Sequence, residues 1–133
     1  MMKVEIEVSF GELLDKLSIL EIKSTKITDP DKLENVNNEL SKLNKISKKI
    51  KEQNSEKFNL YYSKLLEINK KLWSIEDEIR ICEKNNNFDK TFIKLARDVY
   101  FTNDERFEIK NEINLFYNSG VVEEKEYTEY NPN

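Results

Sequence analysis

Three arginines stand out among the charged residues, because every other cationic side chain in the sequence is a lysine. They are Arg80, Arg97 and Arg106. A guanidinium group binds a carboxylate or a phosphate through two parallel hydrogen bonds, and it tolerates burial better than an ammonium group does. These arginines are therefore the side chains most suited to recognising an anion.

Arg106 falls on the apolar stripe of its predicted helix, and polar residues adjoin the stripes of two other predicted helices. Glu76 precedes Arg80 by one helical turn, so these two side chains can pair. An unpaired buried guanidinium would be very costly, so we expect Glu76, or otherwise Glu21, to pair with Arg106. The sequence thus predicts a polar layer across the helices, formed by Glu21, Glu76, Arg80, Asn103 and Arg106.

This polar layer has two interpretations. A charged layer fixes the register and direction of packed helices, at some cost in stability. Alternatively, the same groups line a pocket for a small anion, such as a phosphorylated or carboxylated metabolite. Helical spacing alone does not show that the helices bring these side chains together.

The composition excludes several kinds of catalytic and metal site. The chain contains no histidine and a single cysteine, Cys82. A Ser-His-Asp triad, the di-iron site of ferritin-like bundles and a zinc site therefore lack the ligands they need. Gly11 and Gly120 are the only glycines, so there is no glycine-rich phosphate loop. We accordingly predict no catalytic residues, no metal ligands and no cofactor.

Two classes of enzyme are built on small helical bundles of this size. All-α nucleotide pyrophosphatases hold magnesium with clustered carboxylates, and Glu105, Glu108 and Glu112 have a suitable spacing on one helix. No clear carboxylate pair lies opposite them, so a solvated face is the favoured interpretation. Chorismate mutases surround a dicarboxylate with cations, which Lys16 and Lys23 could supply with the arginines, but no ordered motif matches. Neither class is favoured.

The elements that would position these residues are helices, because apolar residues recur in steps of three and four along every long segment. Four helices are predicted, over residues 9–27, 30–53, 55–84 and 88–119. The predicted fold class is all-α: a single domain over residues 1–133, built as an antiparallel bundle of four long helices with a short N-terminal β-strand.

Short connections make consecutive helices antiparallel neighbours. We expect the second and third helices to form a hairpin whose seam includes the following residues: Leu40, Leu43, Leu65 and Ile68.

The ends of the helices are marked by residues that can cap backbone groups. Ser9 begins the first helix with a capping box, Asp29 and Ser55 can cap the next two, and Gly120 suits a left-handed C-cap. The last helix has a second candidate capping box at Thr102. We expect it to continue through that point, because neither proline nor glycine interrupts it.

Residues 1–8 alternate apolar and charged side chains, with Val4, Ile6 and Val8 on one side, which is typical of a short β-strand with one buried face. The tail, residues 121–133, carries too many charges to be core. Because a lone strand leaves its backbone groups unpaired, we expect it to pair with the tail or with the same strand of a second subunit.

The charge and hydropathy of the chain exclude other partners. The net charge of -4 gives no reason to expect nucleic acid, and the basic run over residues 42–51 is best explained as a solvated helix face. No apolar run is long enough to cross a bilayer, and glutamates interrupt the N-terminus where a signal peptide would be apolar. We therefore expect no membrane insertion and a cytoplasmic location. Cys82 lies on an apolar stripe and is expected to be buried.

Four stretches in order carry a resemblance to a known family. They are Phe10–Lys23, Leu72–Arg80, Val99–Arg106, and Lys110–Asn114 with the closing Val122–Lys125. They resemble a family of small bacterial proteins known only as a domain of unknown function, whose members occur alone or near glycosyltransferases of envelope polysaccharide synthesis. The resemblance implies an accessory role in that process and supplies no catalytic residues. All five residues of the predicted polar layer lie within its motifs.

We therefore expect a non-catalytic interaction or accessory protein with a protein partner or self-association, and specifically a homodimer. Tyr62, Leu66 and Trp73 widen the apolar surface of the third helix beyond one seam, and the N-terminal strand offers a second route to pairing. The alternative is a small-molecule binder, or an enzyme, acting on a phosphorylated or carboxylated metabolite at the polar layer.

Overall fold

The computed structural model describes residues 1–130, and the regular secondary structure in that range is entirely helical. Four helices follow one another: α1 (Phe10–Lys26), α2 (Pro30–Gln53), α3 (Ser55–Lys84) and α4 (Lys90–Phe116). The prediction of an all-α fold with four helices is therefore confirmed.

The N-terminal caps of the helices are short polar side chains. Ser9 accepts a hydrogen bond from the N–H of Glu12, and Asp29 accepts one from the N–H of Asp31, as the sequence predicted for both caps. At α3 the prediction was wrong by one residue. Asn54 is the N-cap there, because α3 already includes its neighbour Ser55.

Asparagines, rather than glycine, end α3 and α4. Asn86 and Asn118 have positive φ angles of 50° and 52°. The N–H groups of Asn118 and Ser119 bond back to carbonyl oxygens in the last turn of α4, which is the Schellman arrangement. The prediction of a left-handed cap at Gly120 was wrong, since its φ is not positive. A short polar side chain lets asparagine adopt this conformation two residues earlier.

α4 is shorter than the predicted helix at both ends but unbroken. It begins at Lys90 with Asp89 as its N-cap, and it ends at Phe116 rather than near residue 119. Thr102, in the middle of α4, is only 1% exposed. The prediction of a continuous helix is confirmed, and the small polar residue in the apolar stripe lies within the packed interior.

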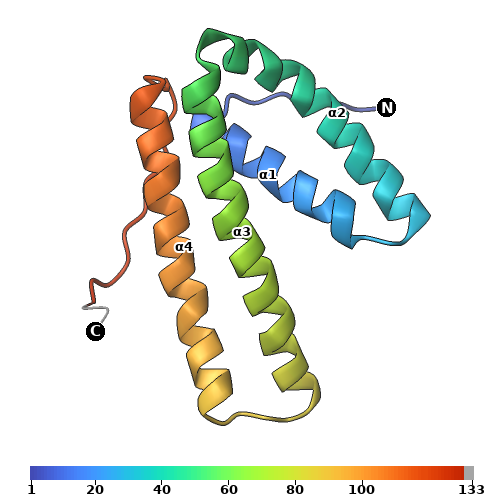
Figure 1. Cartoon of the computed structure of the whole chain (residues 1–133), viewed down its shortest axis with the longest axis vertical. Coiled ribbons are helices and arrows are strands. Elements are labelled where there is room, and N and C mark those ends of the chain that lie inside the picture. Colours follow the sequence, from blue (N-terminus) through green and yellow to red (C-terminus); the bar gives the residue numbers. More distant parts are fainter. Residues whose placement is uncertain (131–133) are drawn as a thin grey trace.

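Two helical hairpins make up the molecule (Figure 1). α3 and α4 lie side by side and antiparallel, and the shorter α1–α2 hairpin packs across one end of them. α2 packs chiefly against α1 and meets α3 only sparsely. The predicted α2–α3 hairpin is not formed along its length, because α2 diverges from α3 after their short connection, although Leu40 and Leu43 pack against the core that contains Leu65 and Ile68.

The main core lies where the two hairpins meet. Its buried residues come from α1, α3 and α4: Leu14, Leu17, Phe58, Tyr61, Leu65, Ile68 and Ile113. Leu40 and Leu43 of α2 pack against its edge. A smaller cluster of Ile75, Cys82 and Leu95 fills the part of the α3–α4 hairpin beyond α1 and α2, so Cys82 is buried as predicted.

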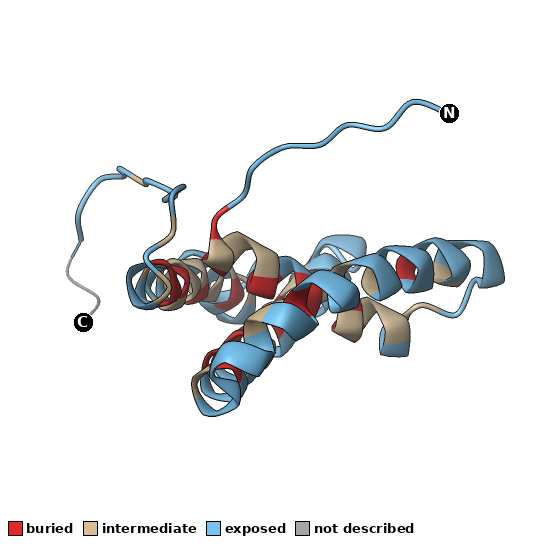
Figure 2. Ribbon diagram, turned by 90° about the horizontal axis from the view of Figure 1, so that it is seen from above, coloured by how far each residue is buried: buried red, intermediate tan, exposed pale blue. Residues whose placement is uncertain are grey.

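Residues 1–8 are extended but do not form the predicted strand. They project away from the helices and are exposed along their length (Figure 2). Val4 is 84% exposed and Ile6 is 77% exposed. A β-strand requires a paired neighbour, and residues 1–130 provide none. That part of the fold prediction was wrong for the single chain.

The C-terminal tail returns along α4 instead of pairing with residues 1–8 (Figure 1). Lys125 Nζ lies 2.7 Å from a carboxylate oxygen of Asp104, and the Tyr130 ring packs against Tyr100 and Phe101. The tail's charges are thus matched by α4, which explains why the alternative of tail and N-terminus pairing was wrong. Residues 131–133 of the predicted tail lie outside the described residues. None of the described helices is both long and apolar enough to cross a membrane.

Candidate functional site

A buried ion pair between α1 and α4 is the centre of the polar interior. The Asp15 carboxylate has a side chain 1% exposed, and the Arg106 side chain is 27% exposed. Arg106 Nε donates to one oxygen of Asp15 at 2.9 Å, and its Nη2 donates to the other. This two-point contact is the strongest geometry available to an arginine and a carboxylate.

Neutral side chains complete the surroundings of Asp15. Asn69 Nδ2 on α3 donates to Asp15 Oδ1 and to Ser18 Oγ, each at 2.8 Å. Ser18 Oγ in turn donates to the backbone oxygen of Asp15 at 2.7 Å. Asp15, Asn69 and Ser18 are all nearly inaccessible to solvent. Three helices therefore meet at one carboxylate whose oxygens are all hydrogen-bonded.

Lys110 extends this network by one helical turn along α4. Its Nζ lies 2.8 Å from Glu12 on α1, 2.7 Å from Glu123 in the tail and 3.9 Å from Asp15. The Lys110 side chain is only 6% exposed. A buried ammonium group is tolerated here because carboxylates surround it.

Gly11 allows α1 to approach α4 closely enough for these contacts. A Cβ atom at this position would lie 2.6 Å from the backbone oxygen of Lys110. The Gly11 N–H donates to Asn114 Oδ1 at 2.7 Å, and both residues are buried. Glu12 and Asp15 follow on the same helix, so the close crossing at Gly11 brings them to the cations of α4.

The electrostatics follow from these pairings. The hydrogen bonds to Asp15 raise the pKa of Arg106 further above its ordinary value. Burial is the largest single influence on the pKa of Lys110 and lowers it, but the hydrogen bonds to Glu12 and Glu123, together with the charges of Asp15 and Glu12, outweigh burial, and the pKa is raised. Both cations therefore stay charged, and neither can act as a general base near neutral pH.

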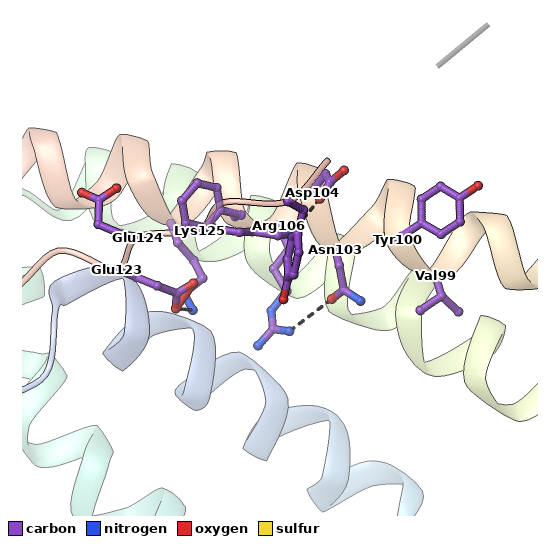
Figure 3. Close-up of a pocket in the computed structure, with 11 residues that line it drawn as sticks. Val99, Tyr100, Asn103, Asp104, Arg106, Glu123, Glu124 and Lys125 are labelled. Atoms are coloured by element: carbon purple, nitrogen blue, oxygen red, sulfur yellow. Dashed lines mark hydrogen bonds and ion pairs between the residues drawn. The ribbon is translucent and has the colours of Figure 1, made fainter. Parts of the chain in front are cut away.

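One cleft lies between α4 and the tail. It has a volume of about 440 Å³, and its lining includes Arg106, Lys110 and the rings of Tyr100 and Phe107. Figure 3 shows the Arg106 guanidinium pointing from α4 toward α1, with Asn103 beside it. Arg106 and Lys110, although they line this cleft, are thus both paired with carboxylates of the protein.

A second cleft lies among α1, α3 and α4 and contains most of the predicted polar layer. It has a volume of about 570 Å³, and four of the five predicted residues line it: Glu76, Arg80, Asn103 and Arg106. Glu76 and Arg80 pair at 3.4 Å, as predicted from their spacing. Arg106 Nη1 reaches Asn103 Oδ1 only at 3.5 Å.

Glu21 is the predicted residue that lies apart from the others. It accepts a hydrogen bond from the Tyr62 hydroxyl at 2.6 Å, and the two residues line a different cleft with α2. Burial, followed by this hydrogen bond, raises the pKa of Tyr62. The expectation that Glu76 or Glu21 pairs with Arg106 was wrong, because Asp15 occupies that position.

Sequence reasoning did not include Asp15, Asn69 or Lys110 in the polar layer, although all three are buried. The missed signal was a second stripe on α1, one residue farther along than the leucine stripe, which is formed by Phe10, Leu13, Leu17 and Leu20. It combines small and apolar residues at helical spacing, and all of them are buried: Gly11, Leu14, Asp15, Ser18 and Ile22. Two buried stripes indicate a helix packed on more than one side.

Within residues 1–130, no group of three or more acidic or cysteine side chains is arranged to hold a metal ion. The arrangement therefore defines an all-helical protein whose interior is held by a charge-paired polar network. The chain belongs to a family of unknown function, DUF6165, which it matches over residues 2–132. Comparison with curated proteins and with solved structures gave no match.

Family membership confirms the resemblance seen in the motifs as far as a family of unknown function. The bacterial origin and the proximity to glycosyltransferases stay predictions.

Proposed function

We propose that this protein is a non-catalytic interaction module that associates with a second copy of itself through residues 1–8. The observation that carries this proposal is the uncovered N-terminal segment. Its apolar side chains alternate with charged ones, and Val4 and Ile6 are almost fully exposed. Alternation of this kind fits a strand with one covered face.

An extended segment with free backbone groups is a template for pairing with another strand. The described residues contain no strand that could receive it within the same chain. A second copy supplies an identical segment in an identical state. Pairing would satisfy the free backbone groups and join the apolar faces of the two strands into one larger face.

Exposed apolar residues at the same end of the molecule offer a surface for the paired segments. A two-stranded ribbon is marginal in water by itself and needs such support. The N–H of Phe10 bonds to Ser119, so residues 1–8 leave the helices beside the end of α4. Near this end of α4 and the start of the tail, the exposed apolar residues include Leu115, Phe116, Val121 and Val122.

The polar network supports a non-catalytic role. Arg106 and Lys110 already contact carboxylates of the protein, and neither offers a base or a nucleophile near neutral pH. An accessory role in envelope polysaccharide synthesis, implied by the motifs, is the context in which we place this module.

Light scattering at micromolar concentration tests the proposal. The wild-type protein should have twice the mass of one 15.9 kDa chain. Ile6→Lys should return it to one chain, because a charge would enter the covered apolar face. Ile6 is 77% exposed, so the helices themselves should be unaffected.

Glu7→Gln serves as the matched control on the charged face of the same segment, and it should leave the mass doubled. A wild-type mass of one chain, or an Ile6→Lys protein that stays doubled, would contradict the proposal.

A second candidate function is the binding of a phosphorylated or carboxylated metabolite in the cleft among α1, α3 and α4. The observation that favours it is that Glu76, Arg80, Asn103 and Arg106 line one cleft of about 570 Å³. It ranks second because Arg106 is already paired with Asp15, and Arg80 with Glu76.

Calorimetric titration with inorganic phosphate tests this second function. Binding that Arg80→Gln weakens, and that Arg97→Gln on the same protein does not, would support it. Arg97 is a suitable control because its guanidinium lies over the Phe101 ring. A wild-type protein that takes up no phosphate at millimolar concentration would count against it.

A further inference from the structure

The residues that carry this inference are the charged side chains of the N-terminal segment. Lys3, Glu5 and Glu7 occupy alternate positions, so in a strand they share the face opposite to the apolar residues. Among the described residues, none of these three forms an ion pair within the chain. These three charged side chains can therefore pair with charges on another chain.

We infer that two copies of this segment pair antiparallel in one register, with Lys3 of each copy opposite Glu5 of the other. The inference rests on the self-association proposed above and specifies how it occurs. In this register Val4 lies opposite Val4 of the partner subunit, on the two-fold axis, and Ile6 lies opposite Met2. Symmetry makes the Lys3–Glu5 contact occur twice.

The alternation of side chains eliminates half of the alternative registers. A shift of one residue would place the apolar face of one strand on the charged face of the other. The remaining antiparallel registers move one strand by two residues at a time, and the charges distinguish among them.

Like charges disfavour each of the neighbouring registers. One shift places Lys3 opposite Lys3. The opposite shift places Glu5 opposite Glu5, although it also pairs Lys3 with Glu7. A further shift places Glu5 opposite Glu7 twice. Like charges directly opposite one another are destabilising, and opposite charges are stabilising. The proposed register is the one that pairs Lys3 with Glu5 and opposes no like charges.

The connection to the helices is compatible with this register. Val8 falls just outside the paired residues, and Ser9 follows as the buried N-cap of α1. Val8 is 46% exposed, less than Val4 or Ile6, so it already lies partly against the protein. The ribbon thus ends where the helical body begins.

Charge-swap variants test the register through the dissociation constant of the dimer, measured by sedimentation equilibrium. Lys3→Glu alone places a glutamate opposite Glu5 at both symmetry-related positions, and it should weaken the dimer about tenfold. Lys3→Glu combined with Glu5→Lys restores both pairs and should recover most of the wild-type affinity. Circular dichroism should show the same helix content throughout, because both residues are exposed.

Lys3→Glu combined with Glu7→Lys is the matched control. It would recover affinity only in the neighbouring register that pairs Lys3 with Glu7. Recovery by this pair and not by the Glu5 pair would overturn the inference.

Oxidative cross-linking provides a second measurement that does not depend on charge. Val4→Cys places two cysteines opposite each other on the axis and should form a disulfide-linked dimer readily. Ile6→Cys places each cysteine opposite Met2 and should cross-link much more slowly. Equal rates, or faster linking at residue 6, would overturn the register.

The two proposals fail in different ways. If Ile6→Lys dissociates the dimer but the Lys3 and Glu5 swap restores nothing, self-association stands and the register is wrong. If the wild-type protein is a single chain, both proposals fail.

Discussion

At the scale of single residues, the contact between Asp15 and Arg106 is the most constrained in the molecule. The carboxylate is almost completely inaccessible, and every hydrogen bond it accepts comes from a fixed neighbour on α3 or α4. A buried ion pair contributes little net stability over an apolar pair of similar volume. Losing one partner is far more costly, because the other charge stays buried.

Arg106→Leu should therefore lower the free energy of unfolding by roughly 3–5 kcal/mol, the usual cost of breaking a buried ion pair. Adding Asp15→Leu to the same protein should recover a large part of that loss, since no buried charge is then left uncompensated. Urea denaturation of the single and double variants measures both effects.

Arg97→Leu is the control for this comparison. Arg97 is exposed, so its replacement should change the free energy of unfolding by less than about 1 kcal/mol. Equal losses at the two arginines, or a double variant no more stable than Arg106→Leu, would show that Asp15 and Arg106 are not coupled.

The sequence indicated that Arg106 must have a buried carboxylate partner, but it identified the wrong one. The reason is that Asp15 does not adjoin the leucine stripe from which candidates on the first helix were selected. α1 contacts α2, α3 and α4, so it buries two stripes rather than one. A pattern that assigns a single face to each helix cannot place residues on the second face.

At the scale of the elements, the crossing of α1 and α4 determines which side chains meet. Gly11 lies against the backbone of Lys110, and this contact leaves no room for a side chain. The close approach then positions Glu12, the next residue, and Asp15, one helical turn farther along α1. The glycine is therefore a packing residue whose effect reaches the polar network.

Gly11→Ala should destabilise the protein by roughly 1–3 kcal/mol, the range for overpacking a tight contact. The backbone at this position cannot move without disturbing both helices. Gly120→Ala is the matched control, because a Cβ at that position would meet nothing within 4 Å. We expect the control to be within about 0.5 kcal/mol of the wild type. Thermal or urea unfolding of both variants measures the difference, and equal stability would contradict the close crossing.

Helix number and approximate position could be predicted from the sequence because apolar spacing and caps are local properties. The arrangement of the helices could not. α2 has a clear apolar stripe, but the stripe does not specify whether it covers α1 or α3. Leu40 and Leu43 instead complete the edge of a core formed by the other three helices.

At the scale of the whole molecule, the tail is attached to α4 at two places: Glu123 pairs with Lys110, and Lys125 and Tyr130 farther along the tail contact Asp104. The hydrogen bond from Lys125, and then that from Tyr130, hold the pKa of Asp104 below its ordinary value. The hydrogen bond to Asp104 also raises the pKa of Tyr130 to about 12. The attachment therefore depends on an ionised carboxylate and a neutral phenol.

These shifts define the pH range of the attached tail. The stability that ionised Asp104 gives to the tail's attachment should be fully present above the ordinary pKa of this group, 3.8. It should be lost as the pH falls through the lower folded-state pKa. At alkaline pH, the stability that the neutral Tyr130 hydroxyl gives to this attachment should be fully present below its ordinary pKa, 10.0. It should be lost as the pH rises through about 12. Nuclear Overhauser contacts between Tyr130 and Phe101 measure attachment. Contacts that disappear between pH 5 and pH 9, or persist unchanged at both extremes, would contradict this account.

The N-terminal segment shows why strand pairing cannot be predicted from a local pattern alone. Its alternation predicted a strand, yet residues 1–8 form none, and residues 1–130 contain no strand with which it could pair. A sequence specifies a strand's two faces locally, whereas pairing depends on a neighbour that one chain does not have to contain. The proposed function therefore depends on pairing of this segment with a second copy of the chain.

Amide hydrogen exchange of residues 2–8, followed by NMR at several protein concentrations, is the sharpest test of self-association through this segment. Pairing predicts that alternate amides of the segment are protected at high concentration and that the protection is lost on dilution through the dimer's dissociation constant. Amides that exchange at the rate of an unstructured peptide at every concentration would contradict self-association through this segment.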